Sequence, residues 1–249
     1  TNRSNEALTQ YKHVIHLHYR YLNTQPSNDI QAAIGRIAIV ADCAHSLGAV
    51  QNGKKTGSIA DFSSFSFHAV KNLTTAEGGA ATWKRIEGID NDKLYRKYHL
   101  YSLHGQSKDA LEKEQKASWE YDVIGAWYKC NMTDISAALG ISQLEKYDTL
   151  LEKRRQIIRI YNSVCNDLGI YHLNHSTENS SSSGHLYITR IPGITLEQRN
   201  EIIIKMAQMG VACNVHYKPL PMMTAYKNQG FNIEDYPNAH AQYENEITL

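Results

Sequence analysis

The stretch DFSSFSFHAVKN at residues 61–72 decides the fold class of this chain and draws attention to Lys71. Phenylalanine and serine nearly alternate over residues 62–67, with Ser63 and Ser64 adjacent, and such a pattern predicts a β-strand. Upstream, the run IAIVA at residues 37–41 is typical of a parallel strand covered on both faces, and it ends at Asp42. An acid therefore ends one predicted strand, and a lysine follows the other.

This combination suits the chemistry of pyridoxal 5'-phosphate (PLP). A lysine can form a Schiff base with the cofactor aldehyde if its site is partly desolvated. A carboxylate aimed at the pyridine nitrogen keeps that nitrogen protonated, as an electron sink requires. We predict Lys71 and Asp42 as catalytic and cofactor-binding residues, and Ser66 as a hydroxyl for the cofactor phosphate. Gly78 and Gly79 permit a tight turn after the lysine.

Several segments, taken in order, resemble the signature of the DegT/StrS family of PLP-dependent sugar aminotransferases. The early segments are DCAHSLGA (42–49), GSIAD (57–61), SFHAVKN (66–72) and EGG (77–79). The later ones are KCNMTDI (129–135), AALG (137–140), QLE (143–145), RR (154–155) and VHYKPL (215–220). Ala76 departs from a glycine that is common in the family, and Cys130 departs from an aromatic residue. The resemblance covers nearly the whole chain.

The resemblance implies an α/β fold of the aspartate-aminotransferase-like type (fold type I). Residues 1–140 would form the PLP-binding large domain with a mostly parallel sheet. Residues 141–249 would form a linking helix and a small α/β C-terminal domain. Family members carry more sequence at both ends, so we expect this chain to be a fragment that lacks the N-terminal part of the large domain and the extreme C-terminus.

The same resemblance assigns further site residues. His45 would pack on the cofactor ring, and Asn131 would reach the phosphate of the neighbouring subunit's cofactor, which requires a homodimer with a shared active site. His216 and Tyr217 would border the sugar. Each assignment has a structural alternative: a core histidine, a turn asparagine and a simple strand end. Asp42 could likewise cap a helix after its strand.

The resulting hypothesis is an aminotransferase that moves an amino group from an amino acid, glutamate by family analogy, to a nucleotide-linked keto sugar. A PLP-dependent sugar dehydratase is an alternative, although such relatives carry histidine where this chain has Lys71. A regulatory or sensor protein, or an inactive fragment of the same fold, is another alternative. The Lys71/Asp42 pair favours the enzyme.

Composition narrows the function classes. The chain has 249 residues, of which 42% are hydrophobic, and a net charge of +1, which gives no reason to expect binding to nucleic acid or to an anionic membrane. No apolar run approaches the ~20 residues that cross a bilayer. His13, His16 and His18 lack acidic or cysteine neighbours, so we predict no metal. The cysteines are widely spaced, which favours a reducing cytoplasm over a disulfide scaffold: Cys43, Cys130, Cys165 and Cys213.

Periodicity predicts the remaining elements. A helical pattern begins at Thr133, with Gly140 as an interruption and Gly169 as the stop. Thr195 and Gln198 predict a capping box at the start of a helix that ends at Gly210. The other predictions are short strands at 14–19, 79–83, 185–191 and 211–217, helix or loop at 90–104 and 109–118, and a mobile polar loop at 174–185.

Overall fold

The computed structural model describes residues 26, 28–108 and 120–249. The chain divides into two compact units: residues 1–44 with 55–142, and residues 45–54 with 143–249. Each unit is described by itself. The predictions for residues 14–19 and 109–118, and for the histidines at 13, 16 and 18, concern residues outside the described ranges.

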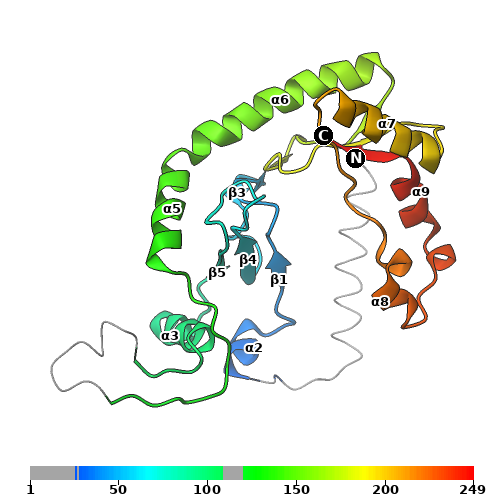
Figure 1. Ribbon diagram of the computed structural model, residues 1–249. Helices are drawn as coiled ribbons and strands as arrows, with labels where there is room; N and C mark the ends of the chain where they lie inside the picture. The colour runs from blue at the N-terminus through cyan, green and yellow to red at the C-terminus, as the bar shows by residue number, and fades with distance from the viewer. Residues whose placement is uncertain (1–25, 27, 109–119) are drawn as a thin grey trace. The chain divides into compact units, whose positions relative to one another are not determined.

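The first unit contains a three-stranded sheet in the order β1-β4-β5, drawn in blue and teal in Figure 1. Strand β1 (Val40–Asp42) runs parallel to β4 (Phe62–Ser66), and β4 runs antiparallel to β5 (Gly79–Trp83). The helices of this unit are α2 (Asp29–Ile34), α3 (Asn91–Ser102) and α5 (Asp134–Glu145). The strands predicted from residues 62–67 and 79–83 are confirmed. The sheet as described holds one parallel and one antiparallel pair.

The apolar run at 37–41 differs from its prediction. Only residues 40–42 form a strand, and Val40 is 70% exposed because little of the described chain packs on its face of the sheet. The prediction that this strand is covered on both faces is therefore wrong for the described residues.

A forked ion pair holds the start of β4 against the chain that enters β1. The two guanidinium nitrogens of Arg36 donate to the two carboxylate oxygens of Asp61 at 2.6 and 2.7 Å. The backbone N–H of Ile39 donates to the same carboxylate at 2.9 Å. The hydrogen bond from Arg36 lowers the pKa of Asp61 below its usual value, although burial opposes the shift.

The second unit contains two small sheets and several helices. The sheets are ordered β3-β2-β7 and β6-β8-β9, and β2 pairs antiparallel with β7. Their strands are β2 (Val50–Gln51), β3 (Lys54–Lys55), β6 (Tyr171–His172), β7 (Ser180–Ser181), β8 (Ile188–Arg190) and β9 (Glu246–Thr248). The helices are α6 (Tyr147–Asp167), α7 (Leu196–Gln208), α8 (Thr224–Lys227) and α9 (Pro237–Asn245), with 3₁₀ turns at Leu220–Met222 and Ile233–Asp235.

The helical pattern from Thr133 to Gly169 forms two helices rather than one. Gly140 lies inside α5, and the break falls at Lys146 instead. The hydroxyl of Tyr147 donates to the main-chain oxygen of Leu47, and Tyr147 is buried, which fixes the start of α6. Gly169, at φ 67°, lies just beyond the helix, as predicted for its stop.

Buried side chains from α6 and the strand region beside it form the core of this unit. Ile158, Cys165 and Tyr187 are buried together. The ring of His175 stacks on Tyr187 with centroids 5.4 Å apart, and its Nδ1 lies 2.7 Å from the hydroxyl oxygen of Ser182. Burial lowers the pKa of His175, so the ring favours its neutral form. The segment 174–185 was predicted as a mobile loop, but its backbone pairs with β2 and buries Ser183.

The β–α–β prediction at the C-terminal end is partly right. The capping box of Thr195 and Gln198 is present at the start of α7, and β8 lies within the predicted strand 185–191. The predicted strand 211–217 is wrong in extent, because only Asn214 forms a ladder pair, with Thr248. The sequence analysis missed β9 (Glu246–Thr248), which pairs with β8.

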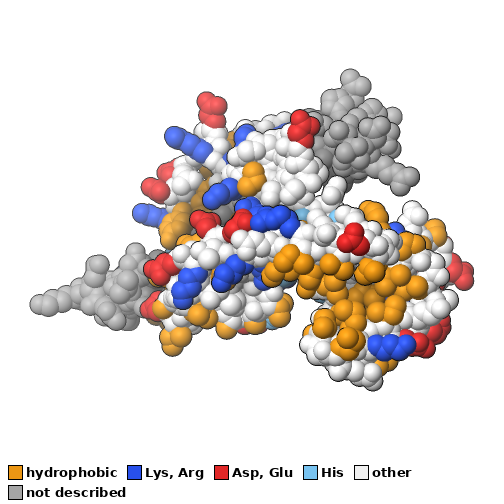
Figure 2. Space-filling view, turned by 90° about the horizontal axis from the view of Figure 1, so that it is seen from above, with side chains coloured by type: hydrophobic (Ala, Val, Ile, Leu, Met, Phe, Trp, Pro, Cys, Tyr) orange, Lys and Arg blue, Asp and Glu red, His pale blue; other side chains and the backbone are white. Residues whose placement is uncertain are grey.

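Hydrophobic side chains are also frequent at the surface, and Figure 2 shows some of them gathered in patches. Helix α5 is an example, since Ile135, Ile141 and Leu144 are 86%, 63% and 63% exposed. Within the described part of the chain, no helix is both long and apolar enough to cross a lipid bilayer. Residues 26, 28–108 and 120–249 hold no group of three or more His, Cys, Asp and Glu side chains suited to a metal ion.

Candidate active site

Asp42 and Ser66 lie at the same edge of the first unit's sheet. The parallel pairing of β1 and β4 places Asp42 opposite Ser64. Ser66 is two residues further along, so the Cα atoms of Asp42 and Ser66 are about 8 Å apart, given the usual strand spacing and rise. The carboxyl ends of parallel strands form the edge at which α/β proteins bind ligands. The two polar residues predicted for one cofactor thus share one edge.

The carboxylate of Asp42 is exposed and held by a turn. One of its oxygens accepts a hydrogen bond from the backbone N–H of Ala44 at 3.0 Å. The residues that follow form turns and not a helix, so Asp42 does not cap a helix. A side-chain oxygen bonded to the backbone two residues on is typical of Asp in a turn, and it limits the rotation of the carboxylate.

Lys71 lies in a loop, residues 67–78, which joins β4 to β5. Phe67 closes the loop at its base: its N–H donates to the Gly78 oxygen at 2.8 Å, and its oxygen accepts from the Thr75 N–H at 2.9 Å. The Lys71 N–H donates to the His68 oxygen at 2.9 Å, which forms a turn at the lysine. Lys71 is half-buried. The loop therefore gives the lysine the partial shielding that imine chemistry requires.

Close packing fixes the shape of this loop. A Cβ on Gly79 would lie 2.5 Å from the main-chain oxygen of Phe65, and a Cβ on Gly140 of α5 would lie 2.9 Å from Thr75 Cγ2. Thr75 is 1% exposed, and its hydroxyl donates to the Glu77 oxygen at 2.8 Å. The sequence analysis singled out the glycines after the lysine, but it assigned no role to Thr75 or to the contact with α5.

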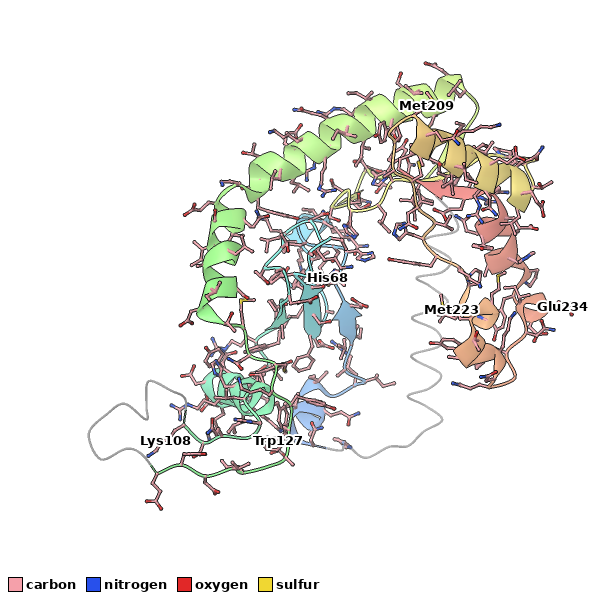
Figure 3. All side chains as sticks on the ribbon, viewed as in Figure 1. His68, Lys108, Trp127, Met209, Met223 and Glu234 are labelled. Carbon is pink, nitrogen blue, oxygen red and sulfur yellow. The ribbon has the colours of Figure 1, made fainter. Side chains whose placement is uncertain are left out.

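Two further loop residues have defined conformations. The Nε2 of His68 lies 3.4 Å from a carboxylate oxygen of Glu77; Figure 3 labels His68 next to the strands of the first unit. Ala76 replaces a common family glycine and has a φ of 65°, a left-handed conformation that glycine adopts without strain. The turn therefore keeps its shape with alanine at some conformational cost.

Asn131 lies in the segment that leads into α5. Its side-chain oxygen accepts a hydrogen bond from the ammonium group of Lys129, and its side-chain nitrogen lies 3.4 Å from the Met132 oxygen. Asn131 is exposed, so its amide remains accessible from outside the unit. Asp42, Ser66 and Lys71 belong to the same unit as Asn131.

The other predicted site residues belong to the second unit. The His45 ring lies against the ring of His185, with centroids 4.2 Å apart and planes tilted by 50°. The hydroxyl of Ser183 donates to the main-chain oxygen of His45, which ties residue 45 to the segment around β7. Family resemblance predicted that His45 packs on a cofactor ring, whereas no sequence pattern indicated its neighbours His185 and Ser183.

His216 and Tyr217 follow the bridge between Asn214 and Thr248. Their rings meet edge to face, with centroids 4.6 Å apart and planes at 85°. Tyr217 is 60% exposed, whereas His216 is half-buried and its Nδ1 has no hydrogen-bond partner within the described residues. The half-buried His216 ring thus packs against the exposed Tyr217 ring, and this contact can present Tyr217 to a ligand.

The chain belongs to the DegT/DnrJ/EryC1/StrS aminotransferase family, whose pattern it matches over residues 12–249. This membership agrees with the resemblance that the sequence motifs indicated. The solved relatives are fold type I aminotransferases, so the α/β fold class predicted from the resemblance is confirmed.

The similar proteins include enzymes of sugar metabolism. An uncharacterized protein of Methanocaldococcus jannaschii, MJ1066, is 37% identical over 85% of this chain and 54% of its own length. A UDP-4-amino-4,6-dideoxy-N-acetyl-β-L-altrosamine transaminase of Campylobacter jejuni is 34% identical over 86% of this chain and 53% of its own length.

A putative sugar aminotransferase of Streptococcus pneumoniae, Spr1654, has been solved in a PMP form. It is 56% identical to this chain, with a TM-score of 0.84 over 90% of this chain and 56% of the other. The same protein has also been solved in a PLP form. The chain thus spans about half the length of the relatives it matches.

Proposed function

We propose that the protein is a PLP-dependent aminotransferase that converts a nucleotide-linked keto sugar into an amino sugar. The observation that carries the proposal is the shared edge of β1 and β4, where Asp42 ends one strand and Ser66 precedes the loop of Lys71. Family membership and the PLP and PMP forms of a relative that is more than half identical support the same cofactor here.

The residues at this edge fit PLP. The donor set contains a carboxylate for the ring nitrogen, a hydroxyl for the phosphate and an amine for the aldehyde: Asp42, Ser66 and Lys71. Asp42 is exposed, and Lys71 is half-buried. Gly79 lies so close to the Phe65 oxygen that a side chain would not fit, and this closeness keeps the lysine loop tight against β4.

When bound, the cofactor supplies an aldehyde and an electron-withdrawing protonated ring. Lys71 would hold the cofactor through its amine and, once freed, would take the proton from the donor's α-carbon. Asp42 would keep the ring nitrogen protonated, and Ser66 would bind the phosphate. We propose glutamate as the donor, by analogy with the family.

The names of relatives suggest the acceptor. Transamination replaces a ketone oxygen by an amine, so the Campylobacter enzyme's printed name corresponds to a UDP-linked sugar whose ketone is at carbon 4. We propose the same class for this protein, with His45 near the cofactor ring and with His216 and Tyr217 beside the sugar. We also propose that the boundary between the large and small domains falls between residues 140 and 141, and that the widely spaced cysteines reflect a cytoplasmic protein.

We further propose a homodimer with a shared active site, in which Asn131 reaches the phosphate bound by its partner. Two features support it: Asn131 is exposed, and α5 next to it carries apolar side chains in solvent. A helix with exposed apolar side chains on several sides is normally covered by another surface. In a longer protein, a second subunit or the rest of the large domain can cover it.

The first experiment tests the cofactor lysine in the full-length protein. We expect PLP to give a visible absorbance band that borohydride fixes covalently onto the peptide containing Lys71. The variant Lys71→Ala should lack the fixed label, whereas Lys93→Ala, an exposed lysine of α3, should keep it. A protein that stays colourless with saturating PLP, or that carries the label on another lysine, contradicts the proposal.

The second experiment tests substrate and subunit sharing. A panel of UDP-linked and other nucleotide-linked keto sugars, assayed with glutamate, should yield an amino sugar, and a deoxygenated product would favour the dehydratase alternative. If the site is shared, mixing subunits of Lys71→Ala and Asn131→Ala should restore about a quarter of wild-type activity, because about half of all dimers are then heterodimers and each heterodimer has one intact site out of two. No recovery after confirmed subunit exchange would refute sharing.

A further inference from the structure

The segment that carries His216 and Tyr217 is attached to the small sheet in an unusual way. Asn214 and Thr248 exchange two backbone hydrogen bonds, of 3.0 and 2.8 Å, across an antiparallel pair. The same register places His216 opposite Glu246, where a regular ladder would repeat this exchange. Instead, the His216 N–H donates to a side-chain oxygen of Glu246 at 3.0 Å. A side-chain carboxylate oxygen of Glu246 therefore accepts the hydrogen bond that its main-chain oxygen would accept in a regular ladder.

The main-chain oxygen and both carboxylate oxygens of Glu246 accept hydrogen bonds. Its main-chain oxygen accepts a hydrogen bond from the Arg199 guanidinium at 3.3 Å, and its second carboxylate oxygen accepts one from the Thr248 hydroxyl. Glu246 and Arg199 are each 1% exposed, and the Arg199 guanidinium lies 4.8 Å from the Tyr243 ring. A buried carboxylate is costly unless it is hydrogen-bonded, so its place is tightly determined.

This arrangement sets the direction of the chain at His216. The backbone turns away from the sheet at this residue, and the half-buried His216 ring then supports the exposed ring of Tyr217. A regular ladder would carry the strand onward and rotate both side chains. The Glu246 carboxylate accepts a hydrogen bond from the His216 N–H, at the residue where the segment leaves the sheet.

We propose that Glu246 is a positioning residue that orients His216 and Tyr217 toward the sugar half of the substrate. The inference rests on the proposed function, because it takes those two residues as the border of the sugar site. The chemical prediction is specific: loss of the Glu246 carboxylate impairs the step that uses the sugar and spares the step that uses the amino acid.

Aminotransferases allow these two steps to be measured separately. The test variant is Glu246→Gln in the full-length protein loaded with PLP. Rapid mixing with glutamate follows the decay of the visible PLP band. Rapid mixing of the PMP form with a UDP-linked 4-keto-6-deoxy sugar follows its return. We expect the apparent affinity for the sugar to fall about tenfold, because the two hydrogen bonds to Glu246 lose their charged acceptor and one of them loses its acceptor oxygen, with the glutamate step changed less than twofold.

Matched controls separate positioning from folding. Glu244→Gln alters a partly exposed glutamate of α9, paired with His240, and should change neither step. Thr248→Val removes one hydrogen bond to the carboxylate without altering charge, and it should shift the sugar step in the same direction by a smaller factor. If Glu246→Gln fails to fold, Thr248→Val alone decides the question.

The outcomes are distinct. A selective loss in the sugar step for Glu246→Gln or Thr248→Val supports the inference. Equal slowing of both steps, or an unchanged sugar step in folded variants, overturns it. Wild-type protein that fails to convert any keto sugar contradicts the proposed function itself, and this result is obtained before any variant is made.

Discussion

The Arg36–Asp61 ion pair gives the sharpest stability prediction, because Asp61 precedes the strand that leads to Lys71. Asp61→Asn keeps the shape of the side chain but removes its charge. The carboxylate accepts three hydrogen bonds, and in asparagine an NH₂ group replaces one of its oxygens, so at least one N–H donor then faces another donor. The Asp61 side chain is 8% exposed, whereas Arg36 is 46% exposed. These two exposed fractions determine how strongly solvent weakens the ion pair, and hence how much free energy of unfolding the substitution removes.

A hydrogen bond to a charged group contributes about 1.5–3 kcal/mol when it is buried. Solvent screens the exposed side of Arg36, so the two guanidinium contacts contribute less than their sum. We expect Asp61→Asn to lower the free energy of unfolding by about 2 kcal/mol at pH 7. The pKa of Asp61 is lowered in the folded state, first by the hydrogen bond from Arg36. The stabilisation is therefore present above the unfolded pKa of about 4 and is lost as pH falls through the lower folded pKa.

The assay is urea unfolding at pH 7 and at pH 3, followed by tryptophan fluorescence. Trp83 is a suitable probe, because it pairs with Phe62, next to Asp61, and stacks on Tyr98 at 4.9 Å. The difference between wild type and Asp61→Asn should shrink at pH 3. Glu152→Gln, in an exposed ion pair of α6, should leave the midpoint unchanged. An equal loss at both pH values would refute the charge-based explanation.

Three further changes have defined outcomes. Gly79→Ala places a Cβ 2.5 Å from the Phe65 oxygen, so it should cost about 2 kcal/mol of unfolding free energy and release PLP on gel filtration. Ala76→Gly relieves a φ of 65° and should raise stability by about 0.5 kcal/mol in urea unfolding. Burial lowers the pKa of His175, so wild-type stability should fall as pH drops from 7 toward 5; in His175→Gln this acid-induced loss should be smaller, as thermal unfolding at each pH can measure.

Local patterns were sufficient to predict much of the fold. The Phe/Ser pattern at 62–67 predicted β4, and Thr195 with Gln198 predicted the start of α7, since each signal depends on neighbours within one turn or strand. The apolar run before Asp42 likewise predicted β1, and β4 ends at Ser66, one residue before the end of the predicted strand. Their parallel pairing followed from family resemblance, and the register places both residues at one edge.

Long-range partners were not predictable in this way. Strand β9 is three residues long, and its sequence, Glu-Ile-Thr, becomes a strand only because β8 and Asn214 flank it. The polar segment 174–185 resembled a mobile loop, but its backbone pairs with β2, more than a hundred residues earlier in the chain. The exposure of Val40 also depends on tertiary context, since hydrophobicity alone does not say whether another layer packs on that face of the sheet.

The lysine loop shows why a signature of this kind includes residues without reactive groups. Lys71 is placed by backbone bonds at Phe67 and by contacts that leave no room for a side chain at Gly79 or Gly140. Close backbone approach thus shapes the loop that carries Lys71, the lysine proposed to form the Schiff base, together with polar contacts such as the one from the Thr75 hydroxyl to the Glu77 oxygen. Enlarging Gly140 to alanine should therefore reduce the rate of Schiff-base formation with PLP, although Gly140 is a helix residue that contacts Thr75 and not the lysine itself. A rate equal to wild type would show that the loop can shift without moving the amine.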